Sequence, residues 1–387
     1  MHVEVFSSHL NFTCLLLPTI LHIIIILHPR SKFNLIFYLL LILKLKIPNS
    51  IYLLTSIFIG ILSFVCLPYW SSSLPSYFML SNSASTPSSG TERSSTAWSN
   101  NAALYASSLS QIPSSISIAA AQLLSLSIPI GDNLPISFVD VAAGPGTLTM
   151  EVIDNMQKLH IGGKLLITDF APGMIDGAKQ RIRILTEEGK LSSNIQIDYA
   201  IMDGQALEIP DASVTHVGCM FGIMFYADVM KGIKELRRIL VPGGRAVIGT
   251  WRDAGAARIT NDFAAYLGLP HGEAGTSSTN ELVAKLNRMA EIGKDPVTLT
   301  NDLLTAGFTS VEIHAVPTTF RSSDWAPFLA MMRSNPAMSQ FFIAAPADTD
   351  WDTQWKNFLT TGSGKKYVPN GTELEVTWLA NVAVAIA

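Results

Sequence analysis

The feature that most constrains the fold is an alternation, between residues 136 and 253, of short apolar segments with longer amphipathic segments. Strands that alternate with helices in this way form a parallel sheet covered by helices on both faces. We therefore expect an α/β domain. The predicted strands are Ser137–Val141, Lys164–Asp169, Asn194–Met202, Ser213–Phe221 and Arg245–Thr250. The predicted helices are Thr147–Leu159, Pro172–Gly189 and Val229–Leu240, preceded by two helices in Asn101–Leu126 that Pro113 separates.

A glycine-containing loop follows the first predicted strand, in the order Asp140-Val-Ala-Ala-Gly144-Pro-Gly146-Thr147. Glycine allows a tight turn and a close approach of the backbone to a ligand, and the amides that start the next helix can bind polar groups. An ordinary strand–helix turn has the same composition. A dinucleotide-binding loop requires G-x-G-x-x-G, whereas the residues from Ala142 are A-A-G-P-G-T, so this register disfavours NAD.

Two further acidic positions end predicted strands. Asp169 ends the second strand, where a carboxylate can bind both hydroxyls of a ribose; alternatively it caps the helix after Ala171. Asp203 and Gly204 follow the third strand, where they suit adenine; alternatively they form a plain Asp-Gly turn. Because the carboxyl ends of parallel strands meet at one edge of a sheet, the combination indicates a nucleoside cofactor.

Four segments carry a resemblance to a known family. They are VDVAAGPGTLTMEV (139–152), TDFAPGMIDGAK (168–179), MDGQALEIPDASVTHV (202–217) and MKGIKELRRILVPGGRAVIGTW (230–251). In these segments the chain resembles the class I S-adenosylmethionine-dependent methyltransferases, in particular the small-molecule branch with the ubiquinone/menaquinone C-methyltransferases and their fungal relatives. The resemblance covers about residues 98–387 and is specific between 139 and 251.

The resemblance implies a Rossmann-like, doubly wound, seven-stranded and mostly parallel sheet. Val311–Ala315 would be its sixth strand, after a helix at Thr300–Gly307, and Leu374–Ile386 its antiparallel last strand. S-adenosyl-L-methionine would be the cofactor. The implied cofactor-binding residues are Asp140, Ala142, Gly144, Gly146, Thr147, Asp169, Phe170, Met174, Asp203, Gly204, Gln205, Met220 and Phe221. The family's first loop glycine is Ala142 here, and its Phe-Asp before strand four is Val214-Thr215.

The function that follows is methyl transfer to a small molecule, by O- or C-methylation of a phenol, quinone or polyketide-like acceptor. The alternative is a non-catalytic relative that binds the cofactor or a partner. An oxygen nucleophile can require a general base, for which His271, His216 and Tyr226 are candidates, but we assign no catalytic residue. Trp251 either stacks on the acceptor or packs at its strand end. We expect no metal site.

The first 78 residues differ sharply from the rest, with apolar stretches at 12–27, 33–43 and 51–67. A spanning helix needs about 20 apolar residues, so residues 1–70 are either a membrane anchor or sequence before a true start at Met79. The domain would be cytosolic, anchored to a membrane in the first case and soluble in the second.

The rest of the chain is expected to be a linker and one domain. Residues 71–97 form a Ser-rich linker to the methyltransferase domain 98–387. This domain has its cofactor core at 136–253 and substrate-cover elements at 98–128, 258–290 and 320–361. The inserted cover includes a predicted helix at Ser322–Ser334.

Charge and cysteine content exclude other classes. Four of 26 basic and one of 30 acidic residues precede residue 79, which leaves a formal charge of −7 and no electrostatic footprint for nucleic acid. The three cysteines, Cys14, Cys66 and Cys219, form no disulfide framework, and a reducing compartment is expected. The sequence leaves the oligomeric state open.

Overall fold

The computed structural model describes residues 94–108, 111–128, 130, 134–269, 291–343 and 345–387. By their contacts the residues of the chain form two units, 1–83 and 84–387, and the described residues all belong to the second. Among those residues, no helix is long and apolar enough to cross a membrane. The apolar stretches at 12–27, 33–43 and 51–67, and also His271, lie outside the described residues.

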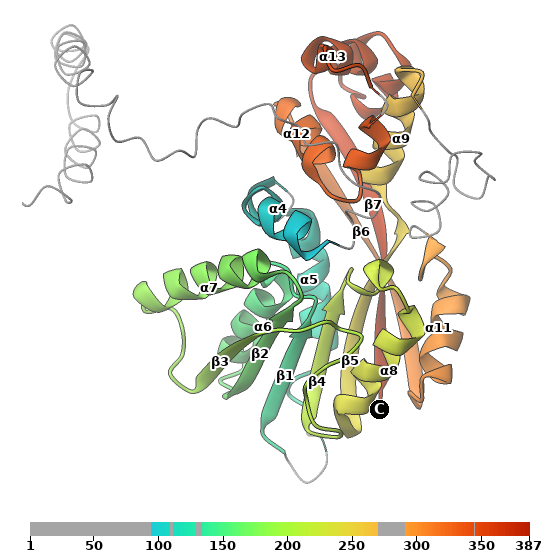
Figure 1. Cartoon of the computed structure of the whole chain (residues 1–387). Helices are drawn as coiled ribbons and strands as arrows, with labels where there is room; N and C mark the ends of the chain where they lie inside the picture. Colours follow the sequence, from blue (N-terminus) through green and yellow to red (C-terminus); the bar gives the residue numbers. More distant parts are fainter. Residues whose placement is uncertain (1–93, 109–110, 129, 131–133, 270–290, 344) are drawn as a thin grey trace, which may run out of the picture. The chain divides into compact units, whose positions relative to one another are not determined.

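Seven strands form one sheet in the order β3-β2-β1-β4-β5-β7-β6, in which β1 to β5 are parallel and β7 is antiparallel to both β5 and β6 (Figure 1). This confirms the expected doubly wound, mostly parallel sheet with an antiparallel last strand. The strand order reverses beside β1, where ligands bind in such sheets. The strands are β1 (Ile136–Val141), β2 (Gly163–Asp169), β3 (Ile195–Ile201), β4 (Val214–Met220), β5 (Leu240–Asp253), β6 (Ser310–Ser322) and β7 (Leu374–Ile386).

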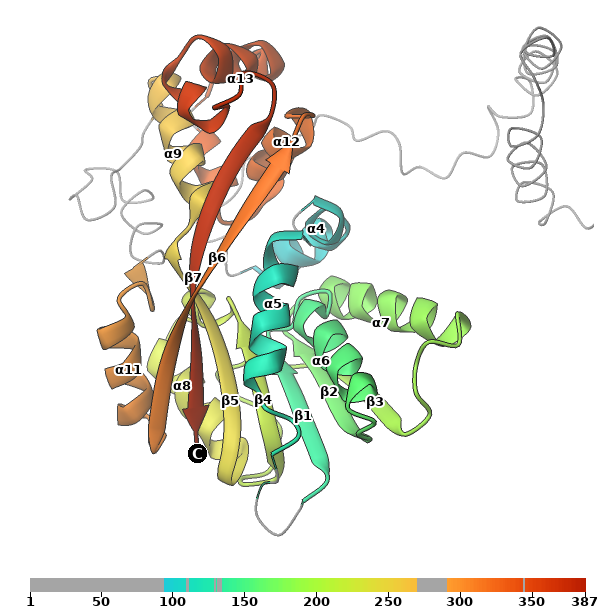
Figure 2. The same ribbon diagram turned by 180° about the vertical axis from the view of Figure 1, so that it is seen from behind.

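Helices cover both faces of the sheet, as Figures 1 and 2 show from opposite sides. One face carries α5 (Gln111–Leu123), α6 (Thr147–Lys158) and α7 (Pro172–Glu187), and the other carries α8 (Val229–Ile239) and α11 (Pro296–Thr305). The core positions of α6, Leu148, Val152 and Met156, recur every four residues and are buried, which is the amphipathic pattern that predicted this helix.

The amino-terminal helices begin earlier than the sequence predicted. Helix α4 (Ser95–Ser108) starts inside the segment 71–97 that we expected to be a linker. Pro113 does not separate the two helices but lies in the first turn of α5, where its missing N–H costs no helical hydrogen bond.

A second group of helices lies beyond the carboxyl ends of β1 to β4. Strands β6 and β7 remain paired from Ser310↔Ile386 to Ser322↔Leu374, so β6 is much longer than Val311–Ala315. The outer part of this pair packs against α9 (Gly255–Tyr266), α12 (Ala326–Ser334), α13 (Trp351–Thr360) and the short helices η4 (Ser339–Phe342) and η5 (Ser363–Tyr367). We call this assembly the cap (Figure 1). The helix predicted at Ser322–Ser334 begins only at Ala326, because β6 runs on to Ser322.

Aromatic side chains form the core of the cap. The Phe263 ring lies 4.9 Å from that of Trp355 and 5.1 Å from that of Phe358, and all three residues are buried. The cap therefore has a hydrophobic core of its own and lies over the carboxyl ends of the parallel strands.

Candidate active site

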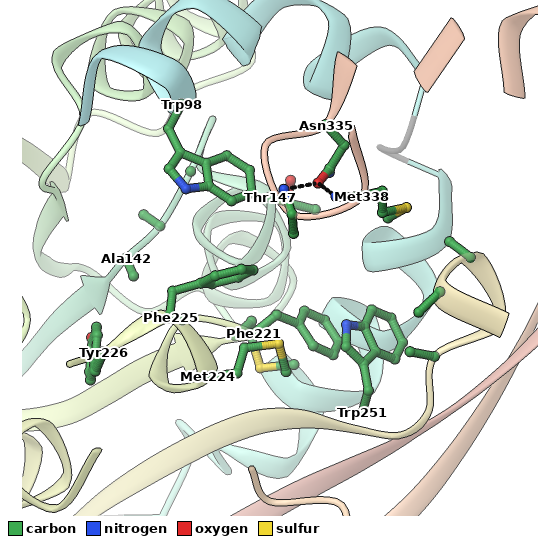
Figure 3. A pocket seen from close by; sticks show the side chains of 18 of the residues that line it. Trp98, Ala142, Thr147, Phe221, Met224, Phe225, Tyr226, Trp251, Asn335 and Met338 are labelled. Carbon is green, nitrogen blue, oxygen red and sulfur yellow. Dashed lines mark hydrogen bonds between the residues drawn. The ribbon is translucent and has the colours of Figure 1, made fainter. Parts of the chain in front are cut away.

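A cavity of about 710 Å³ lies between the carboxyl ends of the parallel strands and the cap (Figure 3). Its lower side is made by the loops after β1, β2, β3 and β4, and its upper side by the start of α9, the segment after α12, and Trp98 of α4. All but one of the residues that the resemblance implied for the cofactor line this cavity. The exception is Gly146. The residues that the resemblance implied therefore lie together at one edge of the sheet.

The loop after β1 has three residues in the left-handed region: Ala142 (φ 53°), Gly144 (φ 57°) and Gly146 (φ 75°). A Cβ on Gly144 would meet nothing within 4 Å, so its backbone conformation alone favours glycine. A Cβ on Gly146 would lie 3.3 Å from Cβ of Ala178 on α7, which places Gly146 in helix packing. Ala142 adopts the same left-handed conformation, a backbone geometry that favours the glycine which the resemblance implied at this position.

Asp140 lies one residue before the end of β1 and is 1% exposed. Its Oδ2 accepts hydrogen bonds from the Thr149 backbone N–H (3.1 Å) and from Thr149 Oγ1 (2.6 Å). Its Oδ1 is buried without a partner in the described part of the chain, and burial raises the pKa of this carboxyl to about 7. A carboxylate oxygen with no partner beside a cavity fits a cationic ligand group.

Asp169 joins two loops at the cavity. Its Oδ2 accepts a hydrogen bond from the Gly144 N–H and its Oδ1 from the Ala171 N–H, both at 2.9 Å. Helix α7 has Ala171 as its N-cap, without a side-chain cap, so the alternative that Asp169 caps this helix is wrong. Burial raises the Asp169 pKa to about 6, and each oxygen keeps a lone pair for a ligand hydroxyl.

Asp203 forms the tight turn that its Asp-Gly sequence indicated. Its Oδ1 accepts hydrogen bonds from the Gln205 N–H (2.9 Å) and side-chain amide (3.1 Å). Gln205 Oε1 in turn accepts the Asp228 N–H at 2.8 Å, which links this turn to the start of α8. Asp203 therefore both forms this turn and lines the cavity.

Tyr226 is packed between two glycines. A Cβ on Gly204 would overlap its hydroxyl, and a Cβ on Gly232 would overlap its ring. Its hydroxyl lies 3.7 Å from Sγ of buried Cys219, and burial raises the Tyr226 pKa well above 10. The phenol therefore stays protonated at neutral pH, so Tyr226 is not suited to be a general base.

His216 belongs to the sheet core. It is fully buried in β4, its Nδ1 lies 2.9 Å from Thr215 Oγ1, and it does not line the cavity. Burial lowers its pKa to about 4. His216 therefore packs as a neutral side chain and does not act on a ligand in the cavity.

The upper part of the cavity has aromatic and apolar walls. The lining also includes a polar group of residues from the end of β5, from α9 and from the segment before α11, namely Arg252, Asp253, Arg258, Asn261, Asp262 and Lys294. Trp251 stacks on Phe221, with ring centroids 4.0 Å apart and planes at 13°, so the Trp251 ring packs at its strand end as one alternative proposed. Phe225 meets Trp98 edge to face at 5.2 Å. Sequence reasoning did not single out several lining residues. They are Trp98, Met224, Phe225, Asn335, Met338, Phe341 and Trp378. Trp98, Asn335, Met338 and Phe341 nevertheless fall within the predicted substrate-cover elements at 98–128 and 320–361. Met224 and Phe225 lie just after the predicted strand Ser213–Phe221.

A family model described as the ubiE/COQ5 methyltransferase family matches residues 127–321. The chain is 33% identical over 114 residues to a demethylmenaquinone methyltransferase of Deinococcus radiodurans, which covers 30% of this chain and 42% of the relative. It is 29% identical over 123 residues to methyltransferase tpcH of Aspergillus fumigatus, covering 31% and 40%. Both alignments thus span less than half of the relative.

Among solved structures, the chain is similar to Haemonchus contortus phosphoethanolamine N-methyltransferase 2 in complex with phosphomonomethylethanolamine and S-adenosylhomocysteine. The sequence identity is 16% and the TM-score 0.38, with 70% of this chain and 52% of that chain covered.

Proposed function

This chain belongs to the ubiE/COQ5 methyltransferase family, and on that premise we propose that it transfers the methyl group of S-adenosylmethionine to a small organic acceptor. The acceptor is a phenol, quinone or polyketide-like molecule that is methylated on oxygen or carbon. The observation that carries this proposal is a single cavity with two unlike ends. One end has buried carboxylates and a left-handed loop, and the other has aromatic walls.

The residues present fit the cofactor. The partnerless Asp140 Oδ1 and the amides of the loop after β1 suit the charged methionine part. Asp169 would bind the ribose hydroxyls, and Asp203 with Gly204 the adenine, with Phe170 and Met174 beside the rings. Thr147, Gln205 and Met220 complete the lining around this end, and Phe221 is shared with the aromatic end through its stack on Trp251. When bound, S-adenosylmethionine supplies an activated methyl group.

The chain itself contributes alignment and exclusion of water. The aromatic walls hold the acceptor against the cofactor end, and such positioning accounts for a large part of the rate in displacement reactions. Of the two candidate bases in the part of the chain that the structure describes, His216 is remote from the cavity lining and Tyr226 is held protonated. If neither acts as a base, acceptors that are already nucleophilic, such as an ionised phenol or an enolised ring carbon, would be preferred.

The first test is calorimetric titration of the full chain with S-adenosylmethionine. We expect binding, and we expect Asp169→Ala to weaken it by roughly 1–3 kcal/mol because hydrogen bonds to a charged group are lost. Asp169→Asn is the isosteric comparison: it keeps the shape and one acceptor oxygen, but its Nδ2 group faces the N–H of Gly144 or Ala171, so it should show part of the same loss. A folded wild-type protein that does not bind the cofactor would refute the proposal.

The second test is turnover. S-adenosylhomocysteine formation is measured by mass spectrometry with phenols, quinones and polyketides as acceptors. Cofactor binding without turnover on any of them would favour the non-catalytic alternative.

The first 78 residues need a separate measurement. Mass spectrometry of the native N-terminus distinguishes a chain that begins at Met1, with a membrane anchor in residues 12–67, from one that begins at Met79.

A further inference from the structure

Among the polar residues that line the cavity outside the cofactor assignment, two are buried and keep an unused hydrogen-bonding atom. The first is the hydroxyl of Ser117 on α5, which lines the cavity, is 1% exposed and has no hydrogen-bond partner in the described residues. Other helical hydroxyls bond to the carbonyl four residues earlier, as Thr260 does to Ala256 at 2.6 Å and Ser334 to Ala330 at 2.7 Å. Ser117 does not, so its hydroxyl remains available to a ligand.

The second group is the side-chain amide of Asn335, which follows α12, lines the cavity and is 7% exposed. Its Oδ1 accepts the backbone N–H groups of Ala337 (2.9 Å) and Met338 (3.3 Å). Because both partners are donors, the oxygen must face them, which fixes the orientation of the amide. The Nδ2 group then makes no hydrogen bond in the part of the chain that the structure describes.

The surroundings of these two groups are flat and apolar. The stacked rings of Phe221 and Trp251 form one wall, and Met224, Met338 and Phe341 also line the cavity. In Figure 3, Asn335 lies across the cavity from the Phe221 and Trp251 rings. Stacked aromatic walls favour a flat aromatic ligand, and a buried polar group without a partner is costly unless the ligand satisfies it.

We propose that Ser117 and Asn335 recognise the oxygen substituents of a flat aromatic methyl acceptor. Asn335 Nδ2 donates to one acceptor oxygen, and the Ser117 hydroxyl bonds to a second polar substituent. The inference rests on the proposed function, because it takes the molecule in the upper cavity to be the methyl acceptor. A site built in this way discriminates strongly against an analogue that lacks the oxygens, since both protein groups would then stay unpaired.

The test compares matched ligands by calorimetry on the full chain. The probes are 1,3-, 1,5- and 2,7-dihydroxynaphthalene and the corresponding dimethylnaphthalenes, which differ only in hydroxyl against methyl. We expect wild type to bind at least one diol about tenfold more tightly than its hydrocarbon, which is about 1.4 kcal/mol. Ser117→Ala should reduce this preference about two- to tenfold, the scale of one hydrogen bond. Asn335→Asp is read out with the corresponding dimethoxynaphthalenes against diethylnaphthalenes, because ether oxygens only accept, whereas a carboxylate could accept a hydrogen bond from a diol hydroxyl. There the preference for the oxygen-containing ligand should fall about two- to tenfold in Asn335→Asp and be abolished in the double variant.

The variants separate recognition from structure. Asn335→Asp keeps an oxygen for the Ala337 and Met338 amides, so the turn is retained while the donor is lost. Ser117→Ala removes an unsatisfied buried hydroxyl, so its melting temperature should be equal or higher while diol binding weakens. Ser115→Ala is the matched control on the same helix, because the Ser115 hydroxyl is exposed and bonds to Thr318 Oγ1 outside the cavity; it should keep the full preference.

The proposal is overturned if wild type binds no diol more tightly than its hydrocarbon, including the case in which neither binds. Satisfaction of both groups by ordered water would give this result. It is also overturned if the preference survives in the double variant. A parallel titration with S-adenosylmethionine distinguishes the two failures. A protein that binds S-adenosylmethionine but shows no diol preference refutes only this inference, whereas a folded protein that does not bind S-adenosylmethionine refutes the proposed function.

Discussion

The two ends of the cavity, which we propose bind the cofactor and the acceptor, are built by different means. At the cofactor end, backbone loops and short carboxylates from consecutive strands bond to one another, as Asp169 does to Gly144 and Ala171. At the acceptor end, large side chains from α4, β5 and the segment after α12 converge on the cavity, together with the small Ser117 of α5. The first end depends on local backbone geometry, and the second on how separate elements pack.

This difference has a consequence for tolerance to substitution. Left-handed backbone and buried carboxylates leave few acceptable residues, so changes at the cofactor end act on stability and binding together. Aromatic walls tolerate swaps of similar volume, so changes at the acceptor end shift specificity while the fold is kept. The following variants test that contrast, in order of decreasing effect.

Gly204→Ala should have the largest effect. Its Cβ would overlap the Tyr226 hydroxyl, and overpacking of this kind costs about 1–3 kcal/mol or more. Denaturant unfolding measures the loss, and adding Tyr226→Phe should restore part of it by removing the overlapping oxygen. Gly144→Ala is the control, because its Cβ meets nothing and only its left-handed backbone is strained, at about 1–2 kcal/mol. Equal losses without rescue would contradict the steric explanation.

Cofactor affinity should depend on pH at the cofactor end. The pKa values of Asp140 and Asp169 are raised to about 7 and about 6 by burial, and a cationic amino group and ribose hydroxyls prefer the ionised carboxylates. Below pH 7 a proton must leave Asp140 for the ligand to bind. Affinity for S-adenosylmethionine should therefore fall by up to about tenfold per pH unit as pH decreases from 7.5 to 5.5. Calorimetry at several pH values measures this, and Asp140→Asn should flatten the profile.

The same raised pKa gives the stability of the free protein the opposite pH dependence: stability decreases as pH rises, whereas cofactor affinity increases. Because the folded pKa of Asp140 lies above its unfolded value of 3.8, the stabilisation of the protonated form is complete below pH 4 and is lost as pH rises to about 7. Thermal melting of the free protein should thus show a downward slope over this range that is smaller in Asp140→Asn. A wild-type profile identical to that of the variant would show that Asp140 is not the group responsible.

Trp251→Leu should have the smallest effect and act on the acceptor end. It removes the stacked partner of Phe221, and aromatic pairs contribute about 0.5–1.5 kcal/mol. We expect the KM for the acceptor to rise a few-fold while the Kd for S-adenosylmethionine changes less than about twofold. Steady-state kinetics and calorimetry on the same sample measure both values. A matching loss of cofactor affinity would mean that the two ends are not separable at this pair.

The sequence by itself determined the sheet and the cofactor end. Strand and helix positions follow from the periodicity of apolar residues, and the loop after β1, Asp169 and Asp203 lie where consecutive parallel strands end. All of these signals are local, because they depend on residues within one strand, one turn or one helix. The sequence even identified the departure at Ala142, and the structure added that this residue has φ 53°.

Only the tertiary structure decided the roles that depend on burial and on convergence of distant segments. It placed His216 in the sheet core and enclosed Tyr226 between two glycines, which removed both as bases. It also brought Ser117 and Asn335 to the same cavity from helices far apart in the chain. No sequence pattern carries such information, because whether a polar atom is left unpaired depends on every element packed around it.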